Sequence, residues 1–267
     1  MTDPELQSQI NAATSYEEFF LPAVFNQWPP HVLDAAHVGP GQQVLDVACG
    51  TGILARTALA RVSPGGSVAG LDLNPGMLAV ATKLEPRIAW QQGMAESLPY
   101  PDESFHVVVS QFGLMFFTDR PKAVREMQRV LMPRGHLAVA VWDTLDHSPA
   151  YAAEVELVQR IAGERAANPL RAPFVLGDPD ELLALFKRAG VGAASITTQH
   201  GKAKFPSIRS MLDADIRGWL PLMGVALSNE VIDQIFEEAE QELSSFVAPD
   251  GTVAFDLSAH IVSGSKE

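Results

Sequence analysis

The segment VLDVACGTG, residues 44–52, places the carboxylate of Asp46 four residues before Gly50, and Gly52 follows closely. Glycines directly after a strand let a ligand approach the backbone, and the helix that follows offers its free N–H groups. Gly50, Gly52 and Ala55 also match the dinucleotide pattern G-x-G-x-x-A, and Asp72 lies 22 residues past Gly50, where a ribose-binding acid belongs. These residue types at this spacing predict a nucleotide-type site.

Asp46 decides between two kinds of ligand. A dinucleotide would bring a pyrophosphate dianion to the turn, and the carboxylate of Asp46 would repel it. S-adenosylmethionine carries a sulfonium and an ammonium beside one carboxylate, so its net positive charge suits an acidic turn. Asp72 would then accept hydrogen bonds from both ribose hydroxyls. Two structural interpretations stay open: Asp46 caps its own loop, which is compatible with ligand binding, and Asp72 is a plain turn residue.

Alternating strands and helices must position these acids. Apolar, β-branched runs predict strands, and amphipathic stretches of about ten residues between them predict crossover helices. This alternation predicts a parallel sheet, in which ligands sit beyond the carboxyl ends of the strands. The predicted strands are 42–48, 67–73, 88–93, 104–112 and 136–142, and the helices between them are 52–62, 74–84 and 121–131.

The pattern changes after Trp142. Helices are predicted at 148–161, 178–190, 207–220 and 228–246, with strands at 192–199 and 252–264. The first 40 residues are predicted to be helical, including 16–25 and 29–38. We therefore predict one α/β domain over 1–267, with an N-terminal helical cover (1–40), a cofactor-binding core (41–145) and remaining strands with inserted cap helices (146–267).

Four motifs together resemble class I S-adenosylmethionine-dependent methyltransferases, and most of all the ubiquinone/menaquinone-biosynthesis-like group that acts on small molecules. They are VLDVACGTG, GLDLNPGML, GMAESLPYPDESFHVVVSQFGLMFFTD and AVREMQRVLMPRGHLAVAVW, in that order within roughly residues 40–145. The resemblance implies the Rossmann-like seven-stranded methyltransferase sheet, whose last strand is antiparallel and inserted beside the fifth. It also implies S-adenosyl-L-methionine as cofactor.

By position, the resemblance assigns the cofactor contacts. The methionine-side turn would be Asp46, Ala48, Gly50 and Gly52, and Asp72 would hold the ribose. The adenine contacts would be Leu73, Met77 and the backbone of Ala95, while Ser110, Gln111 and Phe112 would face the methyl group and the substrate. Met94 stands where the family often has an Asp that accepts from the adenine amino group, so that contact is lost or has moved to Glu96.

A phenol or carbon nucleophile would need a base on a loop over the strand ends. His147 is the first candidate by sequence, followed by Tyr16 and His31, and each of the three also has a purely structural interpretation. Met and aromatic residues at 19–28 and 211–223 suit an adaptable apolar pocket as well as core packing. We therefore expect a hydrophobic or aromatic small-molecule acceptor, with O-, N- and C-methylation all left open.

The composition limits the kinds of partner and the cellular compartment that fit this chain. A net charge of −13 and the absence of a Lys/Arg cluster argue against nucleic acid. The single cysteine, Cys49, fits a reducing compartment, and no apolar run approaches the ~20 residues of a membrane span. With a polar N-terminus, these features predict a cytoplasmic protein. The sequence leaves the oligomeric state open, and a homodimer is one option. Two rival functions are an NAD(P)-dependent oxidoreductase, disfavoured by Asp46, and a non-catalytic S-adenosylmethionine-binding module.

Overall fold

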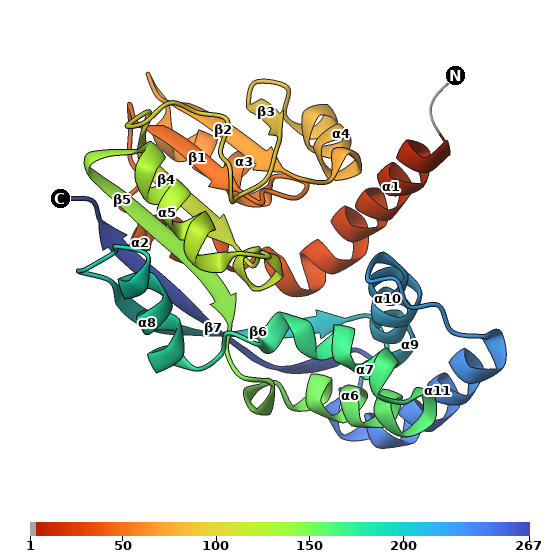
Figure 1. The fold of residues 1–267 in the computed structure, drawn as a ribbon. Coiled ribbons are helices and arrows are strands. Elements are labelled where there is room, and N and C mark those ends of the chain that lie inside the picture. The colour runs from red at the N-terminus through yellow and green to blue at the C-terminus, as the bar shows by residue number, and fades with distance from the viewer. Residues whose placement is uncertain (1–3) are drawn as a thin grey trace.

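A computed structural model of the chain describes residues 4–267, in which one seven-stranded sheet has the order β3-β2-β1-β4-β5-β7-β6 (Figure 1). Strands β1 to β5 pair in parallel, whereas β7 is antiparallel to both β5 and β6. The strands are β1 (Gln43–Val47), β2 (Ser67–Asp72), β3 (Ala89–Gln92), β4 (Phe105–Gln111), β5 (Leu131–Trp142), β6 (Ser195–Phe205) and β7 (Val253–Ser265). The predicted α/β class and the antiparallel last strand beside the fifth are confirmed.

Helices precede, link and cap the strands. Before and between the parallel strands lie α1 (Pro4–Ser15), η1 (Tyr16–Phe25), α2 (Pro29–Ala35), α3 (Ile53–Val62), α4 (Pro75–Leu84), η2 (Leu114–Phe116) and α5 (Arg120–Val130). Between β5 and β6 lie η3 (Leu145–His147), α6 (Pro149–Ala162), α7 (Glu164–Arg171), η4 (Ala172–Phe174) and α8 (Pro179–Arg188). Between β6 and β7 lie α9 (Ile208–Leu212), η5 (Asp213–Trp219), α10 (Leu220–Leu222), α11 (Asn229–Glu242) and η6 (Ser244–Phe246).

Two segments predicted as ordinary helices are partly π-helical. In η1 the N–H of Asn26 donates to the carbonyl of Leu21, five residues back. Pro22 lies inside this helix, where it has no N–H to donate and its ring would crowd the carbonyl four residues before it. The wider winding of a π-helix accommodates such a misfit. The predicted helix 207–220 likewise divides into α9, η5 and α10, and α7 was not predicted at all.

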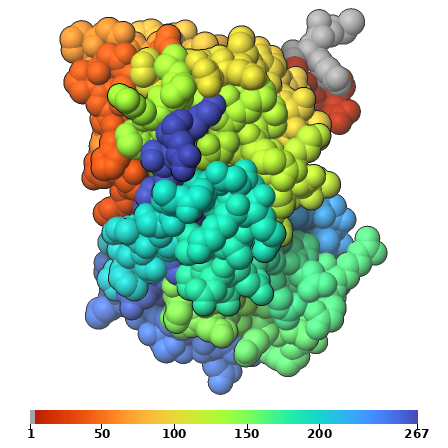
Figure 2. Space-filling model, turned by 60° about the vertical axis from the view of Figure 1, so that its left-hand side comes forward, coloured from red at the N-terminus to blue at the C-terminus, as the bar shows by residue number. Residues whose placement is uncertain are grey.

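The C-terminal strand joins the two halves of the chain. Residues 259–265 of β7 pair with β5, and residues 253–263 of β7 pair with β6, from the second half. Figure 2 shows its dark blue end between the yellow-green residues of the first half and the teal residues around α8. The cap helices therefore attach to the sheet through hydrogen-bonded strands.

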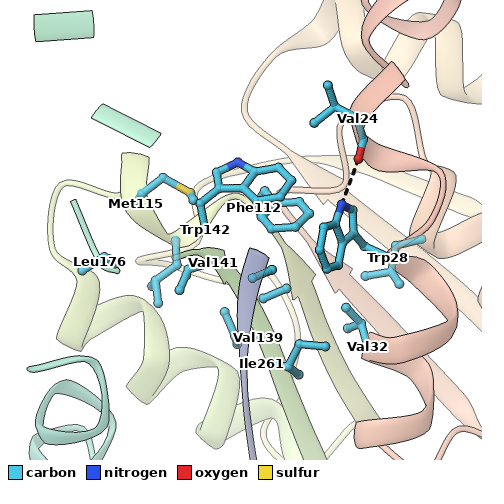
Figure 3. Packing of buried hydrophobic residues seen from close by; sticks show 14 of the residues in the cluster. Val24, Trp28, Val32, Phe112, Met115, Val139, Val141, Trp142, Leu176 and Ile261 are labelled. Carbon is cyan, nitrogen blue, oxygen red and sulfur yellow. Dashed lines mark hydrogen bonds between the residues drawn. The ribbon is translucent and has the colours of Figure 1, made fainter. Parts of the chain in front are cut away.

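An aromatic cluster fastens the N-terminal cover to the sheet (Figure 3). Phe112 and Trp142, at the ends of β4 and β5, stack at 3.6 Å between ring centroids and 8° between planes. Trp28 is fully buried and meets both rings edge-on, at 5.8 Å and 5.5 Å. Its Nε1 donates to the carbonyl of Val24 at 2.8 Å, which satisfies its polar atom. The cover is thereby held over the carboxyl ends of the strands.

Candidate functional site

A cavity of about 1160 Å³ lies at the carboxyl ends of β1, β2 and β4. The carboxyl ends of the strands, the loops after them and the first turn of α4 contribute residues that include Asp46, Ala48, Cys49, Gly50, Asp72, Leu73, Met77, Met94, Ala95, Glu96, Gln111, Phe112 and Trp142. The N-terminal cover contributes Ser8, Ala12, Tyr16, Phe19, Phe20 and Phe25 among others, and the cap contributes Tyr151, Phe174, Asp213, Asp215, Arg217, Trp219, Leu222 and Met223. Both predicted covers therefore face the predicted cofactor turn across one cavity.

Asp46 is buried, with one carboxylate oxygen used and one free. Its Oδ2 accepts from the N–H of Ala55 at 3.0 Å, which fixes the first turn of α3. Its Oδ1 has no hydrogen-bond partner among the residues described. Burial raises the pKa of Asp46 well above its usual value, and the nearby Asp72 adds to the increase. The loop-capping interpretation thus accounts for one oxygen, and the other fits the cationic end of a ligand.

Asp72 organises the same turn from the end of β2. Its Oδ2 accepts from the N–H of Gly50 and its Oδ1 from the N–H of Asn74, both at 2.8 Å. Burial raises the pKa of Asp72, while these backbone N–H groups oppose the increase. A carboxylate has about four acceptor sites, so two remain for a ligand. Asp72 is therefore both a turn residue and a possible acceptor for ribose hydroxyls.

The two glycines of the turn differ in what surrounds them. Gly50 has φ +55° and lines the cavity, and a Cβ there would meet nothing within 4 Å. Gly52 has φ +90°, and a Cβ there would lie 2.4 Å from the ring of Trp90. Gly52 is not among the residues that line the cavity, and its contact with the cofactor stays a prediction. Its role is to admit Trp90 against the turn. Ala48, at φ +58°, does line the cavity.

The predicted adenine contacts lie together at one side. Leu73, Met77, Met94 and Ala95 all line the cavity, and the side chains of Leu73 and Met94 are exposed. Glu96 lines it too, but its Oε1 accepts from the N–H groups of Thr118 and Asp119, at 2.9 Å and 3.3 Å. One oxygen of Glu96 therefore serves the loop rather than a ligand.

At the end of β4, Gln111 and Phe112 line the cavity, and the buried Oε1 of Gln111 has no partner within residues 4–267. Ser110 is fully buried and is not among the lining residues, so its place facing the methyl group stays a prediction. Alternation along the strand explains the difference, because neighbouring side chains point to opposite faces of the sheet.

The candidate bases are placed differently. His147 lies outside the cavity lining, with a side chain 65% exposed and its Nδ1 2.9 Å from Oδ2 of Asp143. His31 is exposed and packs on Trp28, also outside the lining. Tyr16 does line the cavity. Burial, with help from Glu17, Asp72 and Asp46, raises the pKa of Tyr16, so its phenol stays protonated and acts as a donor.

Sequence reasoning missed a buried acid pair in the cap. Asp215 of η5 lines the cavity, and Glu154 of α6 is completely buried. A signal existed: Glu154 is four residues from both Ala150 and Val158, so it falls on the apolar face of its helix. Within the described chain, no group of three or more His, Cys, Asp or Glu is arranged to hold a metal ion.

Comparison with known proteins identifies the segment that carries the turn. A family model described as a methyltransferase domain matches residues 45–139. Residues 45–139 form a methyltransferase domain. This domain contains Asp46, Gly50, Asp72 and Gln111, so the predicted resemblance is confirmed.

Two curated relatives match the domain and its flanks. A demethylmenaquinone methyltransferase of Chlorobaculum parvum is 47% identical over 93 residues, which are 35% of this chain and 38% of that protein. A ubiquinone/menaquinone biosynthesis C-methyltransferase of Legionella pneumophila is 38% identical over 127 residues, 45% of this chain and 51% of that protein. The matches thus cover about half of the length of these relatives or less.

A solved structure shares the fold over most of the chain. The YcgJ protein of Bacillus subtilis has a TM-score of 0.57 and 24% identity, and the match covers 90% of this chain and 98% of that one. The methyltransferase domain therefore sits within a shared overall architecture. None of the helices in residues 4–267 is long and apolar enough to span a membrane.

Proposed function

We propose that the chain transfers a methyl group from S-adenosylmethionine to a small apolar or aromatic molecule. The observation that carries this proposal is the single cavity that joins an acidic glycine turn to an aromatic, Met-containing cap. A pocket for one drug-sized ligand measures roughly 300–1,000 Å³. The cavity, at about 1160 Å³, has room for a cofactor and a second small molecule.

The residues of the turn fit the cofactor. The orphaned Oδ1 of Asp46 suits an ammonium or sulfonium, since a buried acceptor without a partner is unfavourable. Asp72 retains acceptor sites for ribose hydroxyls, and the apolar Leu73, Met77 and Met94 offer surfaces for an adenine ring. When bound, S-adenosylmethionine supplies an electrophilic methyl group carried on a positively charged sulfur.

The residues of the chain position the acceptor and exclude water. Tyr16 and Phe25 of the cover and Trp142 of the sheet surround the region where β4 ends. Orientation of two reactants in such an enclosure contributes up to roughly 7–11 kcal/mol in ideal cases. Because Tyr16 stays protonated, it donates a hydrogen bond to the acceptor rather than removing a proton. With His147 outside the cavity, the proposal includes no side-chain base.

Binding and transfer are tested separately. Thermal unfolding is measured with S-adenosylmethionine, S-adenosylhomocysteine, NAD and NADP; a ligand at 100 times its Kd stabilises the native state by about 2.7 kcal/mol. We expect stabilisation by the first two only, and stabilisation by NAD or NADP alone would overturn the proposal in favour of the oxidoreductase. Transfer of labelled methyl to a panel of phenols, quinols and aromatic amines then identifies the acceptor, and failure across the panel with intact binding would favour a non-catalytic module.

Four further statements remain our proposals. One continuous cluster of buried residues runs from Ala23 to Val262, which supports a single domain. The acidic charge supports the absence of a nucleic-acid partner. A cytoplasmic location and a possible homodimer rest on the sequence alone.

A further inference from the structure

Two carboxyl side chains meet beneath the cap end of the cavity. Asp215, from the π-helical η5, lines the cavity and is 6% exposed, while Glu154, from α6, is 0% exposed behind it. Among the described residues, no hydrogen-bond donor reaches either oxygen of Glu154 or Oδ2 of Asp215. Throughout the described residues, no Lys or Arg side chain bonds to either acid.

Two adjoining carboxylates without a cation cannot both stay ionised in a buried site. Burial and the neighbouring Asp215 raise the pKa of Glu154 well above its usual value, and burial also raises the pKa of Asp215. Glu154 therefore holds a proton that it donates to Asp215. Above about pH 7 this arrangement leaves one negative charge, which Asp215 presents at the cavity wall.

Aromatic rings stand beside this charge. Tyr151 and Phe174 both line the cavity, with ring centroids 5.8 Å apart. Burial, Asp215 and Glu154 together raise the pKa of Tyr151, so its phenol stays neutral. An unpaired carboxylate next to aromatic faces is the combination that recognises an ammonium group, through a charged hydrogen bond and cation–π attraction.

We propose that Asp215, backed by Glu154, binds a protonated amine of the methyl acceptor, so that the acceptor is an apolar or aromatic molecule carrying a basic nitrogen. This inference rests on the proposed function, since it concerns the second ligand of the same cavity. Both acids lie outside residues 45–139, so this end of the cavity belongs to the part of the chain that the methyltransferase domain does not include. The competing explanation is purely structural: a shared proton that only joins α6 to η5.

The test compares amines with neutral molecules of the same shape. The probes are 2-phenylethylamine with 2-phenylethanol, tryptamine with tryptophol, and 4-phenylbutylamine with 4-phenylbutanol. Their affinities are measured by calorimetry with and without saturating S-adenosylhomocysteine. We expect at least one amine to bind tenfold or more tightly than its alcohol, and the wild-type protein showing no such preference in any pair overturns the proposal.

Substitutions at the two acids test whether these residues cause the preference for an amine over its alcohol. Asp215→Asn should abolish it and Glu154→Gln should reduce it, while S-adenosylhomocysteine affinity stays within twofold. Glu156→Gln removes the same charge from the exposed side of α6 and should leave the preference intact. A preference that survives in folded Asp215→Asn overturns the proposal, and if that variant does not fold, an undiminished preference in folded Glu154→Gln overturns it. Wild-type protein that binds the amines but not S-adenosylhomocysteine would instead refute the proposed function.

Discussion

At the scale of single residues, residues of the same type have different structural roles in this chain. Gly50 and Gly52 both match a glycine-rich pattern, yet only Gly50 borders the cavity, and Gly52 makes room for Trp90. Asp46 and Asp72 are both buried acids, but Asp46 keeps a free oxygen whereas each oxygen of Asp72 already holds a backbone N–H.

Alanine at the two glycines should separate binding from stability. Gly52→Ala adds a methyl 2.4 Å from Trp90 at φ +90°, so we expect a loss of about 2–5 kcal/mol in the free energy of unfolding. Gly50→Ala meets open space, so it should cost only about 1–2 kcal/mol while its methyl enters the cavity and weakens S-adenosylhomocysteine binding at least tenfold. Urea unfolding measures the stability of each variant, and calorimetry measures its affinity for S-adenosylhomocysteine. Equal stability losses in the two variants would contradict the different roles assigned to Gly50 and Gly52.

Asp72→Ala should weaken S-adenosylhomocysteine binding at least tenfold, because hydrogen bonds to a charged group contribute about 1.5–3 kcal/mol. Asp72→Asn is the matched control: it keeps the size and one acceptor oxygen, so it can still hold one backbone N–H of the turn. We expect it to bind more weakly than wild type and better than the alanine variant. Unchanged calorimetric affinity in the folded alanine variant would refute a role for Asp72 in binding.

Met94→Asp should tighten cofactor binding several-fold. A thioether is a weak acceptor, whereas a carboxylate would accept from the adenine amino group, worth roughly 1.5–3 kcal/mol gross. The side chain is 49% exposed, so the desolvation cost is partial, and we expect a net gain of about 1 kcal/mol. A purine analogue without the amino group should show no gain. Weaker binding, or equal tightening of both analogues, would show that Met94 does not face that amino group.

At the scale of elements, the strands could be predicted because long apolar runs such as 105–111 must be buried on both faces. The antiparallel last strand beside the fifth is implied by the family resemblance. The location of the acidic glycine turn could also be predicted, because the carboxyl ends of parallel strands meet at one edge of the sheet. The π-helical winding of η1 and η5 could not be predicted, because it depends on local misfit rather than on the period of the hydrophobic residues. The position of His147 also escaped prediction, since a short loop leaves the direction of its side chains open.

The fit of α1 on α4 gives a prediction about the cover. A Cβ at Gly76, in the first turn of α4, would lie 2.4 Å from the backbone of Gln9 in α1. Gly76→Ala should therefore displace α1, faster hydrogen exchange should appear over residues 4–15, and S-adenosylhomocysteine should bind at least about threefold more weakly. Gly39→Ala, where a Cβ meets nothing within 4 Å, is the control. Unaltered exchange in α1 would contradict this packing.

At the scale of the whole molecule, the cavity is built by concentrating uncompensated acids where three parts of the chain meet. Asp46 and Asp72 come from the sheet, and Asp215 with Glu154 comes from the cap. Burial raises the pKa of all four carboxyls. Binding of the proposed positively charged ligands would offset this destabilisation, so the acidity that costs stability would also select the ligands.

The acid pair should make stability fall as pH rises. Burial raises the pKa of Asp215 from 3.8 to about 7, so between these values the folded protein holds a proton that the unfolded chain has released. Stability from this proton is complete below about pH 4 and is lost as pH approaches about 7. Glu154 extends the loss to higher pH, and Tyr151 stays neutral throughout.

In the Asp215→Asn variant, residue 215 cannot titrate. Between about pH 5 and pH 8, the free energy of unfolding of this variant should therefore fall by at least about 1 kcal/mol less than that of the wild type. Asp46 and Asp72 titrate in both proteins and cancel in the difference. Urea unfolding of the wild type and of Asp215→Asn without ligand, repeated across this pH range, measures the difference, and Glu156→Gln is the control. Identical pH profiles for the wild type and Asp215→Asn would show that Asp215 is not buried as an unpaired acid.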